Sequence, residues 1–261
     1  MEQPKVTFII AHHNYQEYLD SCIKSALAQT YPNIHICVID DCSDDIDNLD
    51  NTPYEIIKKI DEPISLEEDK NLRIYSGEKI TSIYITDRPR GPSYARNRGI
   101  ERMWDKTDIF AILDADDENF PTKIEECIKV IMTAPTEIGA VYADHFTHNT
   151  TTGYGRIEYR EPFDVHRLYR ECIVHSGAVI TKHALEHVKE PTGYYDELMR
   201  TCEDYDLWMR ISEKFLIMHI AQPLSFVRVQ PKNSTDTVAK QIWNMNYQRV
   251  FQKKQIRTNG L

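Results

Sequence analysis

Short apolar runs rich in β-branched residues recur along the chain, and each is followed directly by polar or acidic residues. The clearest runs are residues 6–11, 34–39 and 109–113, with amphipathic helices expected at 15–29 and 94–104. A continuous apolar run predicts a strand buried on both faces, which is typical of a parallel sheet covered by helices. Strand, helix and parallel strand connect through a right-handed crossover. The sequence therefore predicts an α/β fold with a mostly parallel central sheet.

The remaining elements are expected to be more mixed. Residues 44–79 are charged and predict an irregular surface connection, helical only at 54–60. The other expected elements are strands at 82–86, 139–143, 172–181, 215–220 and 224–229, helices at about 121–132, 163–169, 182–188, from 201 onward and at 237–257, and a hairpin or flap within 148–159.

Composition limits the classes of function. With 261 residues, 41% of them hydrophobic, the chain can bury a substantial core. Its 41 acidic and 31 basic residues give a net charge of −10, which argues against broad electrostatic binding to nucleic acid or to an anionic membrane.

Cysteine spacing and hydropathy bear on the compartment. The six cysteines form no C-x-x-C pair, so their spacing supports neither a zinc site nor a disulfide framework. The first residues lead into a strand without a signal-like segment, and no apolar stretch reaches the roughly 18 residues of a membrane span. We expect a cytoplasmic protein that meets a membrane only through a partner or its C-terminal helix.

The acidic cluster after the strand at 109–113 is the strongest chemical signal. Asp114, Asp116 and Asp117 occupy three of four successive positions. Carboxylates this close raise one another's pKa unless a cation or donors compensate, so the cluster predicts a divalent metal site. Mg²⁺ and Mn²⁺ prefer oxygen ligands and often share them with substrate phosphates. The alternative interpretation is an acidic turn that caps a helix.

Polar groups follow the other strands as well. His12 and His13 follow the first strand, and Asp40 and Asp41 follow the second. In open α/β sheets ligands bind at this carboxyl edge. Arg96 lies in the first turns of a helix, where free N–H groups and the helix dipole favour an anion such as phosphate, although a solvated helix face is the simpler interpretation for one arginine.

Several ordered motifs resemble glycosyltransferase family 2. They are the opening run from Val6 to Asn14, Val38-Ile39-Asp40-Asp41-Cys42-Ser43-Asp44, Gly91-x-Ser93-x-Ala95-Arg96-Asn97-x-Gly99-Ile100, Leu113-Asp114-Ala115-Asp116-Asp117 followed by Pro121, and Glu203-Asp204-Tyr205-Asp206-Leu207-Trp208-x-Arg210. The resemblance covers residues 4–230. It implies a GT-A fold and an inverting transfer of sugar from a nucleotide donor.

The resemblance also implies a division of the chain. It predicts one GT-A domain over residues 1–261, with a Rossmann-like, mostly parallel sheet flanked by helices. Residues 1–117 would form the nucleotide-sugar-binding half and residues 118–230 a mixed acceptor-binding and catalytic half. Residues 231–261 would form a helical extension that covers the domain, contacts a partner or mediates self-association.

On the donor side, the resemblance assigns residues to the nucleotide sugar. Asp41 would contact the base of the nucleotide, with Ala11 and His13 beside it on the first loop. Asp114 would hold the ribose, next to Ala115. The choice of a UDP-sugar rests on the resemblance alone.

The resemblance places the metal and the leaving group at the acidic cluster. Asp116 would be the principal ligand of Mn²⁺ or Mg²⁺, and the cation would neutralise the departing diphosphate with help from Arg96. Asp117 would act through water or as a helix cap. Gln230 stands where many members carry a histidine that approaches the metal or the diphosphate.

Inversion needs a base on the face of the sugar opposite the leaving group. The resemblance makes Asp204 that base, with Glu203 as the alternative, and both could instead complement the helix dipole. Asp206 and Arg210 have the spacing of an i,i+4 ion pair.

The acceptor side is less defined. His175, Ser176 and Tyr194 match family segments that line the acceptor, or they form turns. The acceptor itself, a glycan, a lipid-linked oligosaccharide or another hydroxyl compound, cannot be read from the sequence. Two other classes stay open: a sugar-1-phosphate nucleotidyltransferase, and a non-catalytic nucleotide-sugar-binding or assembly subunit.

Overall fold

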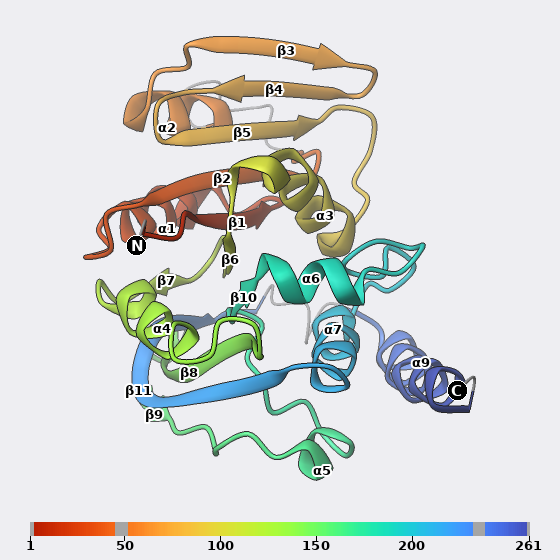
Figure 1. The fold of residues 1–261 in the computed structure, drawn as a ribbon. Coiled ribbons are helices and arrows are strands. Elements are labelled where there is room, and N and C mark those ends of the chain that lie inside the picture. The colour runs from red at the N-terminus through yellow and green to blue at the C-terminus, as the bar shows by residue number, and fades with distance from the viewer. Residues whose placement is uncertain (1–2, 45–51, 232–237, 260–261) are drawn as a thin grey trace.

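The computed structural model describes residues 3–44, 52–231 and 238–259 of the chain. An eleven-stranded sheet runs through these residues, with helices on both of its faces (Figure 1). Along its main path the strands follow the order β3-β4-β5-β2-β1-β6-β10-β8-β11-β7, and β9 pairs with β8.

The parallel part of the sheet is built as the apolar runs predict. β1 (Val6–His12) pairs in parallel with β2 (Ile34–Asp40) and with β6 (Ile109–Asp114), and β2 pairs in parallel with β5 (Ile80–Ile85). The four strands therefore direct their carboxyl ends to one edge of the sheet. Residues at this edge, such as Ala11 and Asp114, are direct neighbours in the strand register.

Helices cover both faces of these strands and close two apolar cores. Helices α1 (Gln16–Leu27), α2 (Pro53–Ile60) and α4 (Lys123–Ile131) enclose one core, and α3 (Pro92–Met103), α6 (Lys182–Val188) and α7 (Glu203–Ser212) contribute to the other. α3 lies very close to the sheet: a Cβ atom at Gly99 would approach the Ile39 Cδ1 atom to 2.5 Å.

The segment at 44–79 corrects one prediction. Its helix is present as α2, whose first turn is capped by the Thr52 hydroxyl, which accepts a hydrogen bond from the Glu55 amide at 3.3 Å. However, β3 (Ser65–Asp69) and β4 (Leu72–Ser76) form an antiparallel hairpin at the edge of the sheet where an irregular connection was expected. The prediction missed β3 because its side chains are all exposed and mostly acidic, as suits an edge strand. Residues 45–51 of that expectation lie outside the described residues.

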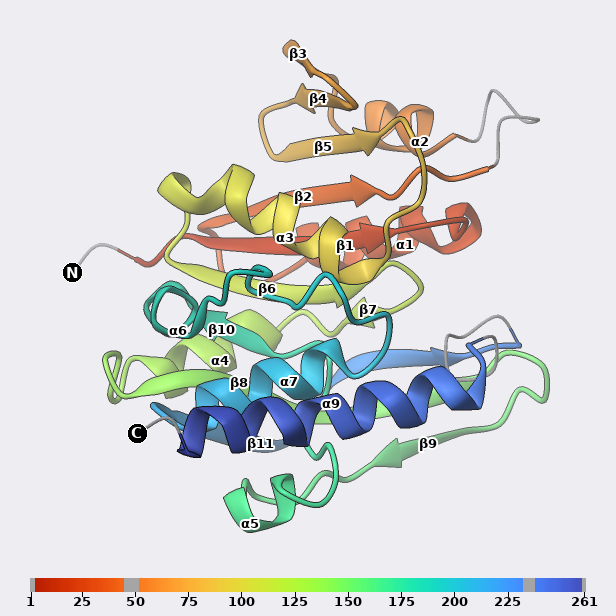
Figure 2. The same cartoon turned by 90° about the vertical axis from the view of Figure 1, so that its right-hand side faces the viewer.

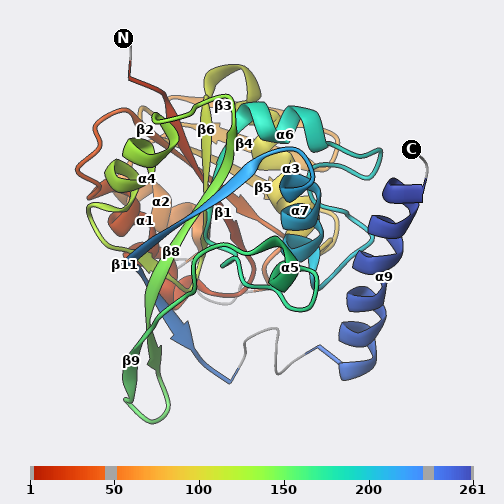
Figure 3. The ribbon, with the colours of Figure 1, turned by 60° about the horizontal axis from the view of Figure 1, so that its bottom comes forward.

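The second half of the sheet is mixed. β10 (Val179–Thr181) lies antiparallel between β6 and β8 (Ile138–Asn149), and β9 (Gly155–Glu158) forms the expected hairpin with β8 (Figure 3). The strand expected at 172–181 is thus only three residues long, because residues 172–178 form an irregular segment.

Two separately expected late strands are one long strand. β11 (Leu216–Val229) pairs in parallel with β8, and its register shifts on both sides of Pro223. Proline cannot donate a ladder hydrogen bond, so a bulge there keeps the strand continuous. β11 also pairs with the short strand β7 (Glu118–Asn119). The short helix α5 (Val165–Leu168) lies within the helix expected at 163–169.

The C-terminal helix covers the domain, as one alternative predicted. α9 (Lys240–Asn259) lies along α7 (Figure 2). The Lys253 ammonium reaches the Asp206 carboxylate of α7 at 2.8 Å, and Asp206 also pairs with Arg210 at 2.9 Å, as its spacing predicts. Asp206 is 0% exposed. None of the described helices is long and apolar enough to cross a membrane.

We expect Asp206→Ala to destabilise the fold by about 3–5 kcal/mol, because it leaves the buried Arg210 guanidinium without its nearest carboxylate, whereas Lys253 keeps its ion pairs with Asp196 and Glu190. Urea unfolding followed by circular dichroism measures this. Lys253→Met keeps the Asp206–Arg210 pair and should cost less, and Lys129→Met on the exposed face of α4 should change stability by no more than about 0.5 kcal/mol. Equal stability of Asp206→Ala and the unchanged protein would contradict this account of how α9 is held.

Candidate active site

A buried arginine joins the carboxyl edge of the sheet to the start of α7. The Arg96 guanidinium of α3 donates to the Asp114 carboxylate at 2.8 Å and to the Glu203 carboxylate at 2.7 Å. Arg96 is 5% exposed, and its guanidinium lies 5.3 Å from the centroid of the Tyr195 ring. The Ser176 hydroxyl donates to the other Asp114 oxygen at 3.0 Å. The end of β6, α3 and the segment of Ser176 therefore meet at Asp114, and Arg96 joins the start of α7 to them.

Asp204 lies next to Glu203 at the start of α7. α7 begins after Cys202, whose φ of 59° puts it in the left-handed region. The half-buried Asp204 carboxylate accepts a hydrogen bond from the Tyr205 amide at 2.8 Å. Burial and, next, the Glu203 charge raise the pKa of Asp204 to about 7. Asp204 can thus exchange a proton near neutral pH.

The acidic cluster contains two carboxylates whose pKa values are raised. Burial and the charges of neighbouring aspartates raise the pKa of Asp116, and they raise the pKa of Asp117 well above its usual range. Carboxylates that destabilise one another in this way form an oxygen donor set that Mg²⁺ or Mn²⁺ would stabilise. Asp116 would contribute the more accessible carboxylate, because Asp117 is buried.

The end of β11 closes over this cluster. The Arg228 guanidinium donates to the Asp116 carbonyl at 2.6 Å and also pairs with Glu118, while the Arg228 amide donates to the Asp117 carboxylate at 2.9 Å. The Gln230 side-chain amide donates to the Asp116 carboxylate at 2.9 Å. Gln230 therefore does reach the position expected of the metal ligand, and it does so as a donor to that ligand.

The predicted base-contacting residues lie together at the ends of β1 and β2. The Asp41 carboxylate accepts hydrogen bonds from the Arg90 amide at 2.8 Å and the Gly91 amide at 2.6 Å. Its backbone carbonyl accepts one from the His13 ring at 2.9 Å. Burial is the largest influence on the pKa of the Asp41 carboxyl group, and it raises that pKa. Asp41 thus fixes the loop that leads into α3.

Of the predicted acceptor residues, two lie near Asp114 and one does not. Ser176 binds Asp114 directly, and the neighbouring His175 ring lies 4.5 Å from the His145 ring. Burial lowers the pKa of His175 well below its usual range, so it is neutral. The Tyr194 ring instead stacks on Trp104, which follows the far end of α3, with 5.1 Å between the ring centroids. No described contact joins Tyr194 to the acidic cluster.

Sequence reasoning missed Lys123. Its buried ammonium donates to the Asn119 side chain at 2.9 Å, the Gly177 carbonyl at 2.8 Å and the Ser225 hydroxyl at 2.8 Å. Burial lowers its pKa to about 8. The one signal in the sequence is a lysine at the start of an apolar helix face, which is too common to identify a site.

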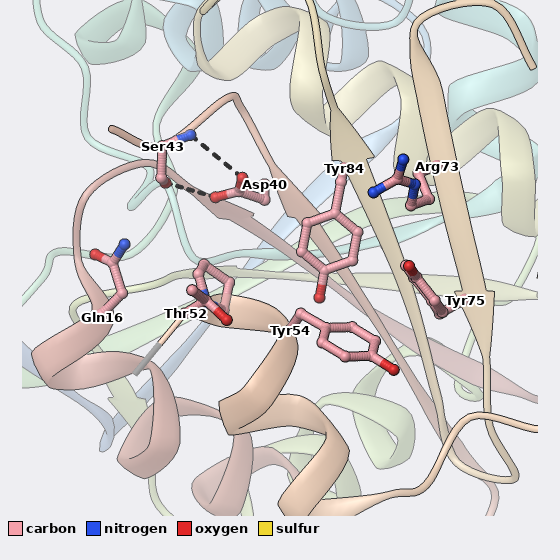
Figure 4. A pocket seen from close by; sticks show the side chains of 9 residues that line it. Gln16, Asp40, Ser43, Thr52, Tyr54, Arg73, Tyr75 and Tyr84 are labelled. Atoms are coloured by element: carbon pink, nitrogen blue, oxygen red, sulfur yellow. Dashed lines mark hydrogen bonds between the residues drawn. The ribbon is translucent and has the colours of Figure 1, made fainter. Parts of the chain in front are cut away.

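A cavity of about 360 Å³ lies beside the end of β2, on the side of α2 (Figure 4). Its lining residues are Gln16, Asp40, Ser43, Thr52, Pro53, Tyr54, Arg73, Tyr75 and Tyr84. None of them was assigned to the nucleotide, the metal or the acceptor, but Asp40 ends β2 directly before Asp41, so the cavity adjoins the predicted nucleotide side of the carboxyl edge.

Comparison with known proteins identifies the class to which this fold and site belong. The family model described as glycosyl transferase family 2 matches residues 7–184, which is more than half of the chain. The chain therefore belongs to glycosyl transferase family 2 and is a glycosyltransferase, and the resemblance seen in its motifs is confirmed.

Relatives and solved structures agree with this assignment. An uncharacterized glycosyltransferase of Rickettsia prowazekii (strain Madrid E) is 26% identical over 251 residues, which cover 92% of this chain and 68% of the relative. The succinoglycan biosynthesis protein ExoO of Rhizobium meliloti (strain 1021) is 32% identical over 126 residues, 48% of this chain and 29% of the relative.

Crystal structures of S. aureus TarS 1–349 share the fold. The complex with UDP-GlcNAc superposes with a TM-score of 0.67 at 14% identity, and the complex with UDP with a TM-score of 0.64 at 15% identity. The matches cover 90% and 87% of this chain, and each covers 61% of the TarS chain. The expected GT-A fold is thereby confirmed.

The raised pKa of Asp204 predicts a pH-dependent stability difference. Below about pH 4, the pKa of Asp204 in the unfolded chain, Asp204 is protonated in both the folded and the unfolded protein. Between pH 4 and 7 the folded protein keeps this proton and the unfolded chain loses it. The free energy of unfolding therefore falls as the pH rises through this range. Asp204→Asn lacks this cost. We expect the variant to gain stability relative to the unchanged protein as pH rises from 4 to 7, with no further gain above. Urea unfolding at several pH values measures the difference, and a constant difference would contradict it.

Proposed function

We propose that the protein transfers a sugar, with inversion, from a nucleoside-diphosphate donor to a hydroxyl acceptor at the edge formed by Asp114, Asp116 and Asp204. The observation that carries the proposal is the Arg96 bridge, which joins Asp114 to Glu203, the neighbour of Asp204. The carboxylates next to the leaving group and the carboxylate next to the acceptor are thereby held in one site. The UDP and UDP-GlcNAc complexes of TarS support a UDP-sugar as the donor.

Asp204 is the general base in this proposal. It is half-buried, and its pKa of about 7 matches a proton acceptor that works near neutral pH. Glu203 is the weaker candidate because Arg96 already binds its carboxylate at 2.7 Å. Glu203 instead anchors the first turn of α7 and raises the pKa of its neighbour.

In this proposal Asp116 would hold a divalent cation beside the diphosphate of the donor. Mn²⁺ or Mg²⁺ bound there supplies positive charge that stabilises the departing diphosphate. Gln230 and Arg228 orient Asp116 through its carboxylate and its carbonyl. Asp117, whose carboxylate accepts from the Arg228 amide, holds the end of β11 in place.

The nucleoside lies against the ends of β1 and β2. Ala11 and Asp114 are neighbours in the strand register, so a ribose held by Asp114 has its base directed toward the first loop and His13. Asp41 shapes that pocket, since its carboxylate positions the backbone of Arg90 and Gly91. Ala115, next to Asp114 in sequence, is buried in an apolar core.

The acceptor enters beside Ser176 and His175. These residues lie within the irregular segment 172–178, which meets Asp114 through the Ser176 hydroxyl, whereas the Tyr194 ring stacks on Trp104 at the far end of α3. A glycan is the acceptor class that we favour, and the similarity to a succinoglycan biosynthesis protein supports it.

Thermal shift with a panel of nucleotide sugars tests the donor and the metal. We expect UDP-sugars to raise the melting temperature only when Mn²⁺ or Mg²⁺ is present, because the cation joins the diphosphate to Asp116. Asp116→Asn should abolish this shift. Asp20→Asn, on the exposed face of α1, should retain it. A full shift in Asp116→Asn would exclude Asp116 as the ligand.

Transfer or donor hydrolysis tests the base. Asp204→Asn should lower kcat by about 10²–10⁴ without weakening donor binding, since a general base acts in the transition state. The rate of the unchanged protein should rise with pH to a plateau above about 7, following deprotonation of Asp204. Glu203→Gln should keep a rise to a plateau, with the midpoint moved to lower pH, because the Glu203 charge no longer raises the pKa of Asp204. If Glu203→Gln loses the profile and Asp204→Asn keeps it, the roles are reversed.

A further inference from the structure

Three potential metal ligands lie on the outer face of α6, far along the chain from the acidic cluster. His183, Glu186 and His187 have the spacing H-x-x-E-H, which places all three on one side of a helix. One ligand atom from each lies within 4.8 Å of the other two, and all three side chains are exposed. None of them has a role in the proposed glycosyl transfer.

The His187 imidazole is held in a form that suits a metal ligand. The His187 Nδ1 atom lies 2.8 Å from the His183 carbonyl oxygen. Because a carbonyl only accepts, Nδ1 carries the proton, and the Nε2 lone pair of His187 is directed to solvent. Metal-binding histidines commonly have their second ring nitrogen fixed by such a carbonyl.

Packing keeps the two rings together. The His183 and His187 ring centroids are 4.3 Å apart, and the Phe215 ring meets both edge-on at 5.4 Å and 5.8 Å. The opposite side of α6 is anchored in the core through Ala184, Leu185 and Val188. The Lys214 ammonium lies nearby but is bound to the His187 carbonyl at 2.8 Å.

We propose that His183, Glu186 and His187 form a surface site for one transition-metal ion of the Zn²⁺ class. Two imidazole nitrogens and one carboxylate oxygen suit Zn²⁺ and its later first-row neighbours, whereas the aspartate cluster offers only oxygen ligands. Three protein ligands leave a further position for water or for a group from another molecule. The site links successive turns of α6, which packs against α7, so the bound ion stabilises the surface behind the candidate active site.

Calorimetric titration of the chelator-treated protein with Zn²⁺ tests the site. Excess Mg²⁺ is present to compete at the aspartate cluster, and a Cys172→Ser background removes the exposed thiol. We expect one Zn²⁺ ion per chain at this site, bound more than about tenfold more weakly in His183→Ala and in His187→Ala. His166→Ala is the matched control, because His166 is also an exposed helical histidine, and it should bind Zn²⁺ as the background protein does.

A second measurement separates the site from folding effects. All three ligands are exposed, so the variants should melt at the temperature of the background protein without Zn²⁺ and lose only the Zn²⁺-induced rise. Glu186→Gln should weaken binding by less than loss of either histidine. Undiminished Zn²⁺ affinity in both histidine variants, or an equal loss in His166→Ala, would overturn the proposal. These results do not depend on whether the protein transfers sugar.

Discussion

The structure depends above all on one buried cation between two carboxylates. Burial of a guanidinium is costly, but Asp114 and Glu203 more than offset that cost for Arg96, whose pKa is raised rather than lowered. Removing one member of such a group leaves a charge uncompensated in the interior. Asp114 ends β6 and Glu203 begins α7. The two ion pairs of Arg96 therefore fix the position of the start of α7 relative to the end of β6.

A second charge network holds the same helix from behind. Asp206 lies one turn along α7 and is bound by Arg210 within the helix and by Lys253 of α9. Residues near the end of the chain therefore help to fix the segment that carries Asp204. Two buried ion networks, one through Glu203 and one through Asp206, set the orientation of α7.

The parts that sequence could predict are those in which each element carries its own signal. Strands such as β1 are apolar throughout because they are buried on both faces, and the cluster at Asp116 is adjacent in sequence. The hairpin of β3 and β4 gave no such signal, because every side chain of the edge strand β3 is exposed and β4 buries only Ile74. Lys123 and Tyr194 could not be placed, because their roles are decided by partners such as Gly177 and Trp104 that only the tertiary fold brings near.

The close approach of α3 to β2 has a consequence for the site. Gly99 lets the helix axis sink toward the sheet until Ile39 occupies the space of a side chain. Arg96 lies three residues earlier on the same helix, so its depth is set by this approach. Gly99, which has no side chain, thus determines how far the Arg96 guanidinium can extend toward the carboxylates. The apolar contact between α3 and Ile39 therefore positions the charged groups of the site.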